Sequence, residues 1–183
     1  INVGVMFQNA VFNQPIEIPD SVNAPEGLAY FLFNDSAFNQ PITIGNNITN
    51  CYMALDCPYS NGQFNQPLVI PNNVTNAGYM LYGQKNMKCD IVIGEKLGPG
   101  GANLLADANF EGNVYVYNNG VRSREFLNKT NATGRINYYV GPSSSMKPSF
   151  FQMWPEHFTG FRDTWAYDSA NDIMVSESAN IYV

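Results

Sequence analysis

Short apolar–x–apolar triplets recur along the first three quarters of the chain, each entered through a proline or another turn residue. One intervening position between two apolar ones is typical of a short strand that buries a single face. A turn rich in Asn, Gly and Pro follows each triplet, and a limb with further apolar residues leads to the next one. The pattern predicts strands at 16–18, 42–44, 68–70, 91–93, 114–116 and 136–140.

The triplets recur at a regular spacing. FNQPIEIP begins at Phe12, FNQPITIG at Phe38 and FNQPLVIP at Phe64, each 26 residues after the last, and MKCDIVIG and FEGNVYVY follow at spacings of 23. A fixed period of about 20–50 residues is the signature of stacked repeats. We therefore predict a mainly β repeat solenoid, leucine-rich-repeat-like, with one short parallel strand per 22–26-residue coil and irregular or short helical return limbs.

Each residue of the repeated motif has a structural role in such a stack. The Phe fills the space between coils, and the Asn amide satisfies backbone groups that lack strand partners at the corner. The Pro fixes φ at the strand entrance, where a missing N–H is tolerated. The residues with these roles are Phe12, Asn13, Pro15, Phe38, Asn39, Pro41, Phe64, Asn65 and Pro67.

The repeat pattern divides the chain into two regions. Residues 1–142 follow the solenoid pattern, and residues 143–183 read as an enlarged return limb with the last strands, continuous with the solenoid. Two further apolar–x–apolar triplets, at 173–175 and 181–183, predict strands in the second region. Both ends of the chain resemble interior pieces of a repeat rather than polar caps, so we expect an excerpt of a longer protein.

The string FNQP[IL]xIPxxVTNxxxM resembles the divergent leucine-rich repeats of BspA type, which occur in bacterial surface proteins and in virion proteins of phages that infect gut bacteria. The match is clearest over residues 1–86. The FNIP repeat of amoebae and giant viruses is also similar, but the later units carry Thr-Asn and Met where that family has a Leu-rich limb. The first resemblance implies a surface-exposed binding or structural role without enzymatic activity.

Composition removes some classes of function. A net charge of −6 with scattered basic residues excludes nucleic acid as a partner, because phosphate binding needs clustered Lys and Arg. No apolar run reaches the roughly 18–20 residues of a membrane span. Three cysteines, Cys51, Cys57 and Cys89, are too few for a disulfide framework. Reduced, buried cysteines are the favoured interpretation, although a Cys51–Cys57 or inter-coil disulfide stays open.

Candidate catalytic chemistry is sparse. His157 is the only histidine and has no recognisable nucleophile context, and the acidic residues do not recur at one repeat position. GPGGAN at 98–103 lacks the Lys-Ser/Thr of a phosphate-binding loop. We therefore expect no enzymatic activity, no catalytic residues, no metal site and no cofactor, with a glycan hydrolase as a distant third hypothesis.

One surface has functional potential. The middle residue of each triplet points away from the core. In the third to fifth triplets this residue is apolar or aromatic, and Tyr117 and Tyr139 extend the stripe. Such a stripe marks a partner or ligand surface, unless another segment or subunit covers it. The candidate binding residues are Thr43, Val69, Val92, Tyr115, Tyr117 and Tyr139.

These observations favour a structural or adhesive protein on a virion or bacterial cell surface. Its expected partners are neighbouring subunits or a host receptor, with an oligomer if it belongs to a virion. The alternative hypothesis is a carbohydrate-binding module that uses exposed Tyr and Trp side chains and takes a glycan as its ligand.

Overall fold

The computed structural model describes residues 6–22, 33, 37–57, 62–97 and 101–117, together with the backbone of the later strands. Strands and turns account for the regular structure of this part of the chain, and no α-helix occurs in it. The strands belong mainly to parallel sheets. The prediction of a mainly β fold is confirmed.

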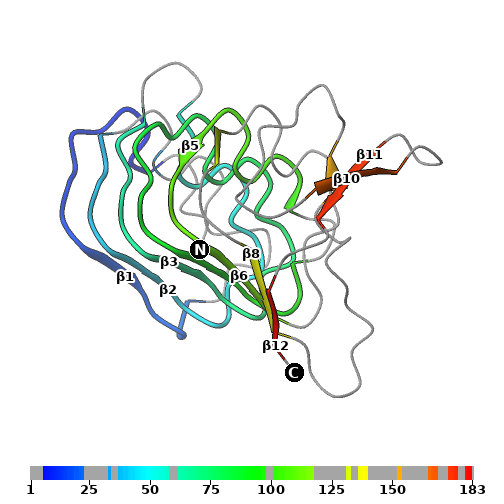
Figure 1. The fold of residues 1–183 in the computed structure, drawn as a ribbon. Helices are drawn as coiled ribbons and strands as arrows, with labels where there is room; N and C mark the ends of the chain where they lie inside the picture. Colours follow the sequence, from blue (N-terminus) through cyan, green and yellow to red (C-terminus); the bar gives the residue numbers. More distant parts are fainter. Residues whose placement is uncertain are drawn as a thin grey trace.

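Seven short strands lie side by side in chain order (Figure 1). All pairs between them are parallel, and they form a two-stranded sheet, β1-β2, and a five-stranded sheet, β3-β4-β6-β8-β12. The first six begin at the positions that the triplets predict. These strands are β1 (Ile16–Ile18), β2 (Ile42–Ile44), β3 (Leu68–Ile70), β4 (Ile91–Ile93), β6 (Val114–Tyr117), β8 (Ile136–Tyr139) and β12 (Asn180–Tyr182).

Equivalent residues of successive repeats are paired. Ile16 lies opposite Ile42, and Leu68 lies opposite Ile91, which in turn lies opposite Val114. A shift by one residue would turn the buried side chains toward solvent, so the apolar alternation itself fixes this register. In β2, β3 and β4 the outer two residues are accordingly buried and the central one is exposed or half-buried.

The Phe residues of the motif form a stack inside the molecule. The ring centroids of Phe12 and Phe38 are 6.4 Å apart, and those of Phe38 and Phe64 are 6.2 Å apart, with nearly parallel planes. Phe33 adds a ring 4.0 Å from that of Phe38. The two separations between motif rings fall within the range of about 4.5–7 Å for favourable aromatic pairs, and the Phe33–Phe38 separation lies just below it. The next two repeats place buried Met87 and Phe110 at the same motif position.

The Asn of the motif connects each repeat to the next one. The Oδ1 atom of Asn13 accepts a hydrogen bond from the backbone N–H of Asn39 at 2.8 Å, and Oδ1 of Asn39 accepts one from the N–H of Asn65 at 2.7 Å. Oδ1 of Asn65 then accepts the N–H of Lys88 at 2.7 Å. The amide therefore supplies an acceptor at a corner where the backbone donor has no strand partner.

The return limbs are irregular rather than helical. Met53, Tyr79 and Asn103, one in each of three successive limbs, have φ values of 55–56°, in the left-handed region. That conformation costs an L-residue roughly 1–2 kcal/mol. Backbone hydrogen bonds between neighbouring limbs offset it, for example the one from Leu55 N–H to the Met80 carbonyl at 2.9 Å.

The last region differs from a simple continuation of one parallel strand per repeat. Strands β9 (Gln152–Met153), β10 (Trp165–Asp168) and β11 (Ile173–Ser176) form an antiparallel sheet in the order β10-β11-β9. Only four residues separate β10 from β11, a length typical of a hairpin and too short for a parallel crossover. The strand predicted at 173–175 therefore lies in this sheet, whereas β12 pairs with β8 in parallel.

A further short parallel pair lies at the Phe position of the motif. It joins β5 (Asn109–Phe110) to β7 (Asn131–Ala132), with Phe110 opposite Ala132. A parallel bridge between Met87 and Phe110 extends the same contact to the preceding repeat. The sequence pattern did not predict this second line of pairing.

Candidate functional site

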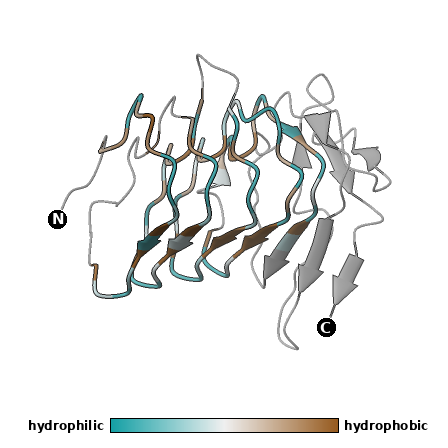
Figure 2. Ribbon diagram, turned by 90° about the vertical axis from the view of Figure 1, so that its left-hand side faces the viewer, coloured by the Kyte–Doolittle hydropathy of each residue, from teal (hydrophilic) through white to brown (hydrophobic). Residues whose placement is uncertain are grey.

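Four of the six candidate binding residues occupy one position of the strands. Val69 lies opposite Val92, and Val92 lies opposite Tyr115. Val69 is the most exposed of the three, with 57% of its surface accessible, whereas Val92 and Tyr115 are half-buried. Thr43 is exposed at the same position of β2. Figure 2 shows the hydropathy along this series of strands, with teal at β1 and brown at β3 and β4.

The remaining two candidates lie two residues after this position along their strands. Tyr117 of β6 lies opposite Tyr139 of β8, and Tyr139 lies opposite Tyr182 of β12. Tyr182 is not among the candidates predicted from the sequence, because the triplet at 181–183 does not by itself give the register in which β12 pairs Ile181 with Tyr138. The side chains of these three tyrosines lie outside the described residues.

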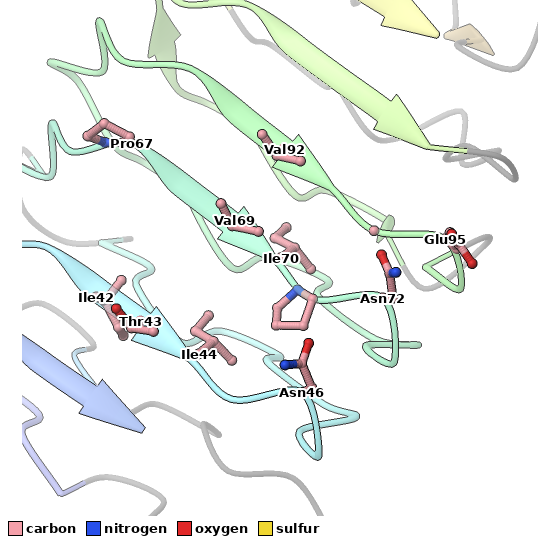
Figure 3. Close-up of a pocket in the computed structure, with 12 residues that line it drawn as sticks. Ile42, Thr43, Ile44, Asn46, Pro67, Val69, Ile70, Asn72, Val92 and Glu95 are labelled. Atoms are coloured by element: carbon pink, nitrogen blue, oxygen red, sulfur yellow. The ribbon is translucent and has the colours of Figure 1, made fainter. Parts of the chain in front are cut away.

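The sheet is interrupted between β2 and β3. These strands follow one another in the series, but β2 pairs with β1 and β3 pairs with β4, in separate sheets. An open groove of about 460 Å³ lies at this place, which we call the seam groove (Figure 3). Its lining residues are Ile42, Thr43, Ile44, Asn46, Pro67, Val69, Ile70, Pro71, Asn72, Val92, Gly94 and Glu95.

Pro71 distinguishes this interruption from the paired strands on either side. The N–H of Leu68 donates to the carbonyl of Asp90, and the carbonyl of Ile70 accepts from Gly94, so these two residues direct their backbone groups toward β4. Because backbone direction alternates along a strand, the groups of positions 67, 69 and 71 face β2. Position 71 is a proline without an N–H, whereas Pro67 has an equivalent in Pro41, which does not prevent β2 from pairing with β1. Val69 is then the one residue of β3 able to donate to β2.

The residue that follows each strand differs between repeats. It is Pro71 after β3, but Gly45 after β2 and Gly94 after β4, and both glycines lie close against the preceding repeat. A Cβ atom at Gly94 would lie 2.5 Å from the Pro71 carbonyl carbon, and one at Gly45 would lie 2.7 Å from the Ile18 carbonyl oxygen. Glycine therefore allows close backbone approach between β1 and β2 and between β3 and β4, whereas proline faces β2 across the seam.

Polar side chains gather at the end of the seam groove, just after the strands. Asn46, Asn72 and Glu95 are exposed and line it. In the preceding repeat pair, the Asp20 carboxylate accepts a hydrogen bond from the backbone N–H of Asn46 at 2.6 Å. Within the described residues, the Asn46 side chain accepts no equivalent hydrogen bond from the backbone N–H of Asn72. In the same part of the chain, the side chains of Asn72 and Glu95 have no protein partner.

The cysteines have the character of structural residues. Cys51 and Cys57 are buried, Cys89 is partly buried, and all three are reduced. Desolvation by burial raises the pKa of the Cys51 thiol to about 12. A thiol in this state is a poor nucleophile and metal ligand, because both roles require the thiolate.

Other candidate chemistry is not found in the described part of the chain. It contains no group of three or more His, Cys, Asp or Glu residues that could hold a metal ion. It also contains no helix with the length and apolarity needed to cross a membrane. His157 lies outside the described residues.

Gln84 is a buried polar residue that the sequence analysis missed. Its Oε1 atom accepts a hydrogen bond from the Phe64 N–H at 2.9 Å, and its Nε2 donates to the Leu55 carbonyl. The side chain is 2% exposed and joins the motif Phe to the return limb of another repeat. Its position after a left-handed Gly83 in a Tyr-Gly-Gln turn was the available signal, but such a turn does not by itself indicate burial.

The comparisons give no relative for this chain: no protein-family model, curated protein or solved structure matches it significantly.

Proposed function

We propose that the chain is a leucine-rich-repeat-like solenoid of BspA type that acts as a non-enzymatic structural or adhesive protein on a virion or bacterial cell surface. It works through protein contacts made by the exposed face of its parallel strands. Support for the repeat architecture comes from in-register pairing of successive repeats, from the Phe stack and from the Asn hydrogen bonds between corners.

The outward-facing row Val69–Val92–Tyr115, exposed at Val69 and half-buried at the other two residues, is the observation that carries this proposal. Aliphatic and aromatic residues recur at one position of adjacent strands, about 4.8 Å apart from strand to strand. A regular apolar row on a surface favours contact with a partner over contact with water. The partner in this proposal is a neighbouring subunit or a receptor on a host cell.

Self-association tests the first of these partners. Val69→Glu places a charge in the row, and Val11→Glu is the matched control, since Val11 is an equally apolar residue that is 94% exposed outside the row. Light scattering over a concentration series is expected to show an assembly that Val69→Glu dissolves and Val11→Glu leaves intact. An unchanged assembly in the Val69 variant would contradict a role of the row in subunit contact.

The second candidate function is a carbohydrate-binding module. Tyrosines in register at Tyr117, Tyr139 and Tyr182, beside Tyr115 of the first row, favour it. Aromatic rings at regular spacing provide stacking surfaces for the apolar faces of sugars. Polysaccharide binding that is lost in Tyr115→Ala would support this function, and a defined protein assembly without such binding would favour the first.

A further inference from the structure

The seam groove leaves backbone hydrogen-bonding groups of two strands without sheet partners. In the first repeat pair, the N–H of Ile16 donates to the carbonyl of Pro41 in the next repeat. The equivalent N–H, that of Ile42, has no such bond to Pro67 among the described residues. Ile42 and Ile44 of β2 therefore face the seam with groups that a ligand or water must satisfy.

The seam is too narrow to admit another strand. Asn39 and Asn65 are joined by a 2.7 Å hydrogen bond at one corner, and Asn73 donates through Nδ2 to the Asn46 carbonyl at 2.8 Å at the other. Both ends of the seam are thus held at the spacing of adjacent repeats, whereas an inserted strand would need about twice 4.8 Å. A ligand must lie over the groove instead of entering the sheet.

The lining selects the class of ligand by charge and shape. It contains no Lys, Arg or His, and Glu95 is its one ionisable side chain. An anionic ligand would meet a carboxylate without a compensating cation. Exposed amides at Asn46 and Asn72 offer both donors and acceptors, and Figure 3 shows them together at one end of the groove, with Val69 and Val92 along its length.

We infer that the seam groove binds a neutral oligosaccharide. Sugar hydroxyls both donate and accept, so they suit the two amides, the Glu95 carboxylate and the Thr43 hydroxyl. The apolar C–H faces of the rings rest on Val69, Val92 and the prolines. A volume of about 460 Å³ lies within the range of roughly 300–1,000 Å³ for small-ligand sites. This inference deepens the second candidate function and rests on it.

The test measures oligosaccharide binding by titration calorimetry. The neutral probes are cellohexaose, maltohexaose and hexa-N-acetylchitohexaose, and the comparison probes are a galacturonic acid hexamer and a lysine-containing hexapeptide. The intact protein is expected to bind at least one neutral probe and neither comparison probe. Asn72→Leu replaces the amide with an apolar side chain of similar size and is expected to weaken binding about tenfold. Asn86→Leu, at an exposed amide outside the groove, is the matched control and is expected to bind like the wild type.

Pro71→Gly tests the origin of the site without removing any polar side chain. It removes the Cβ atom, as at Gly45 and Gly94, and adds an N–H that can donate to the Ile44 carbonyl, so we expect the seam to close and binding to fall about tenfold or more. Slowed hydrogen exchange of the new amide at position 71 shows that the seam has closed. Unchanged binding with a protected amide would overturn the inference.

Three other outcomes would also overturn it: no neutral probe binds, a comparison probe binds better, or Asn72→Leu binds like the wild type. Sugar binding that is lost in Tyr115→Ala but retained in Asn72→Leu would leave the carbohydrate-binding function standing and remove the seam groove as its site. Self-association of Asn72→Leu is measured separately and tests the proposed subunit contact, independently of sugar binding.

Discussion

The Asn of the repeated motif is expected to contribute more to stability in the middle of the stack than at its N-terminal end. Asn39→Ala removes the oxygen that accepts the backbone N–H of Asn65 at 2.7 Å in a partly buried corner. The equivalent substitution, Asn13→Ala, removes the acceptor of the Asn39 N–H at 2.8 Å, in an exposed corner that water can reach. The two variants make the same chemical change in different surroundings.

The magnitudes follow from what replaces the lost bond. A buried N–H without a partner costs about 1–3 kcal/mol, whereas a bond replaced by water costs about 0.5–1.5 kcal/mol. We expect the free energy of unfolding to fall by about 2 kcal/mol in Asn39→Ala and by less than about 1 kcal/mol in Asn13→Ala. Asn39→Asp keeps an acceptor oxygen and should stay within about 0.5 kcal/mol of the wild type at pH 7.

Urea unfolding at 25 °C, followed by circular dichroism and by Trp fluorescence, provides the assay. Equal slopes in the three variants are needed for the comparison, because a changed slope reports a changed unfolded or native state. If Asn39→Asp is as destabilising as Asn39→Ala, the loss of stability does not depend on the acceptor oxygen. If Asn13→Ala costs as much as Asn39→Ala, burial of the corner does not set the size of the loss.

Three further predictions concern buried hydrogen bonds, close backbone approach at a glycine and ionisation of a buried thiol. Gln84→Leu leaves the Phe64 N–H and the Leu55 carbonyl unpaired and should cost about 3 kcal/mol, whereas Gln14→Leu, at an exposed position, should cost under about 0.5 kcal/mol; equal urea midpoints would contradict this. Gly94→Ala brings a Cβ atom 2.5 Å from Pro71 backbone and should lower the melting temperature more than Gly78→Ala, whose Cβ would lie 3.2 Å from its nearest neighbours; the reverse order would refute it. Because the pKa of Cys51 is raised from 9.0 to about 12 by burial, its contribution to stability is present below pH 9 and is lost as the pH rises toward 12. The alkaline loss of stability should therefore be smaller in Cys51→Ala, and an identical pH profile would show that Cys51 is not its source.

The parallel strands could be predicted because each depends on a local pattern. Two apolar residues flank an outward one in β1 to β4, and the register follows from burying the same residues in every repeat. The candidate row Val69–Val92–Tyr115 follows from the same alternation. Predicting the row required only the assumption that equivalent triplets of successive repeats lie side by side.

The seam groove depends on a contrast between repeats rather than on a repeated feature. Pro71 stands where Gly45 and Gly94 stand in neighbouring repeats, and its effect becomes visible only when the direction of each backbone group is known. The antiparallel pairing of β10 and β11 was likewise missed, because an apolar triplet does not encode the direction of its partner. Burial of Gln84 depends on residues 20 and 29 positions away in the chain.

Site-specific cross-linking shows directly whether the exposed face of the strands is the contact surface. A photoreactive benzoylphenylalanine replaces Val69, and in a matched protein it replaces Val11, which is even more exposed but lies outside the row. Both proteins are irradiated in their native assembly, and the cross-linked products are identified by mass spectrometry. If the row is the contact surface, we expect a defined protein or glycan product at position 69 and none at position 11. Equal yields at the two positions, or a product at position 11 alone, would contradict it.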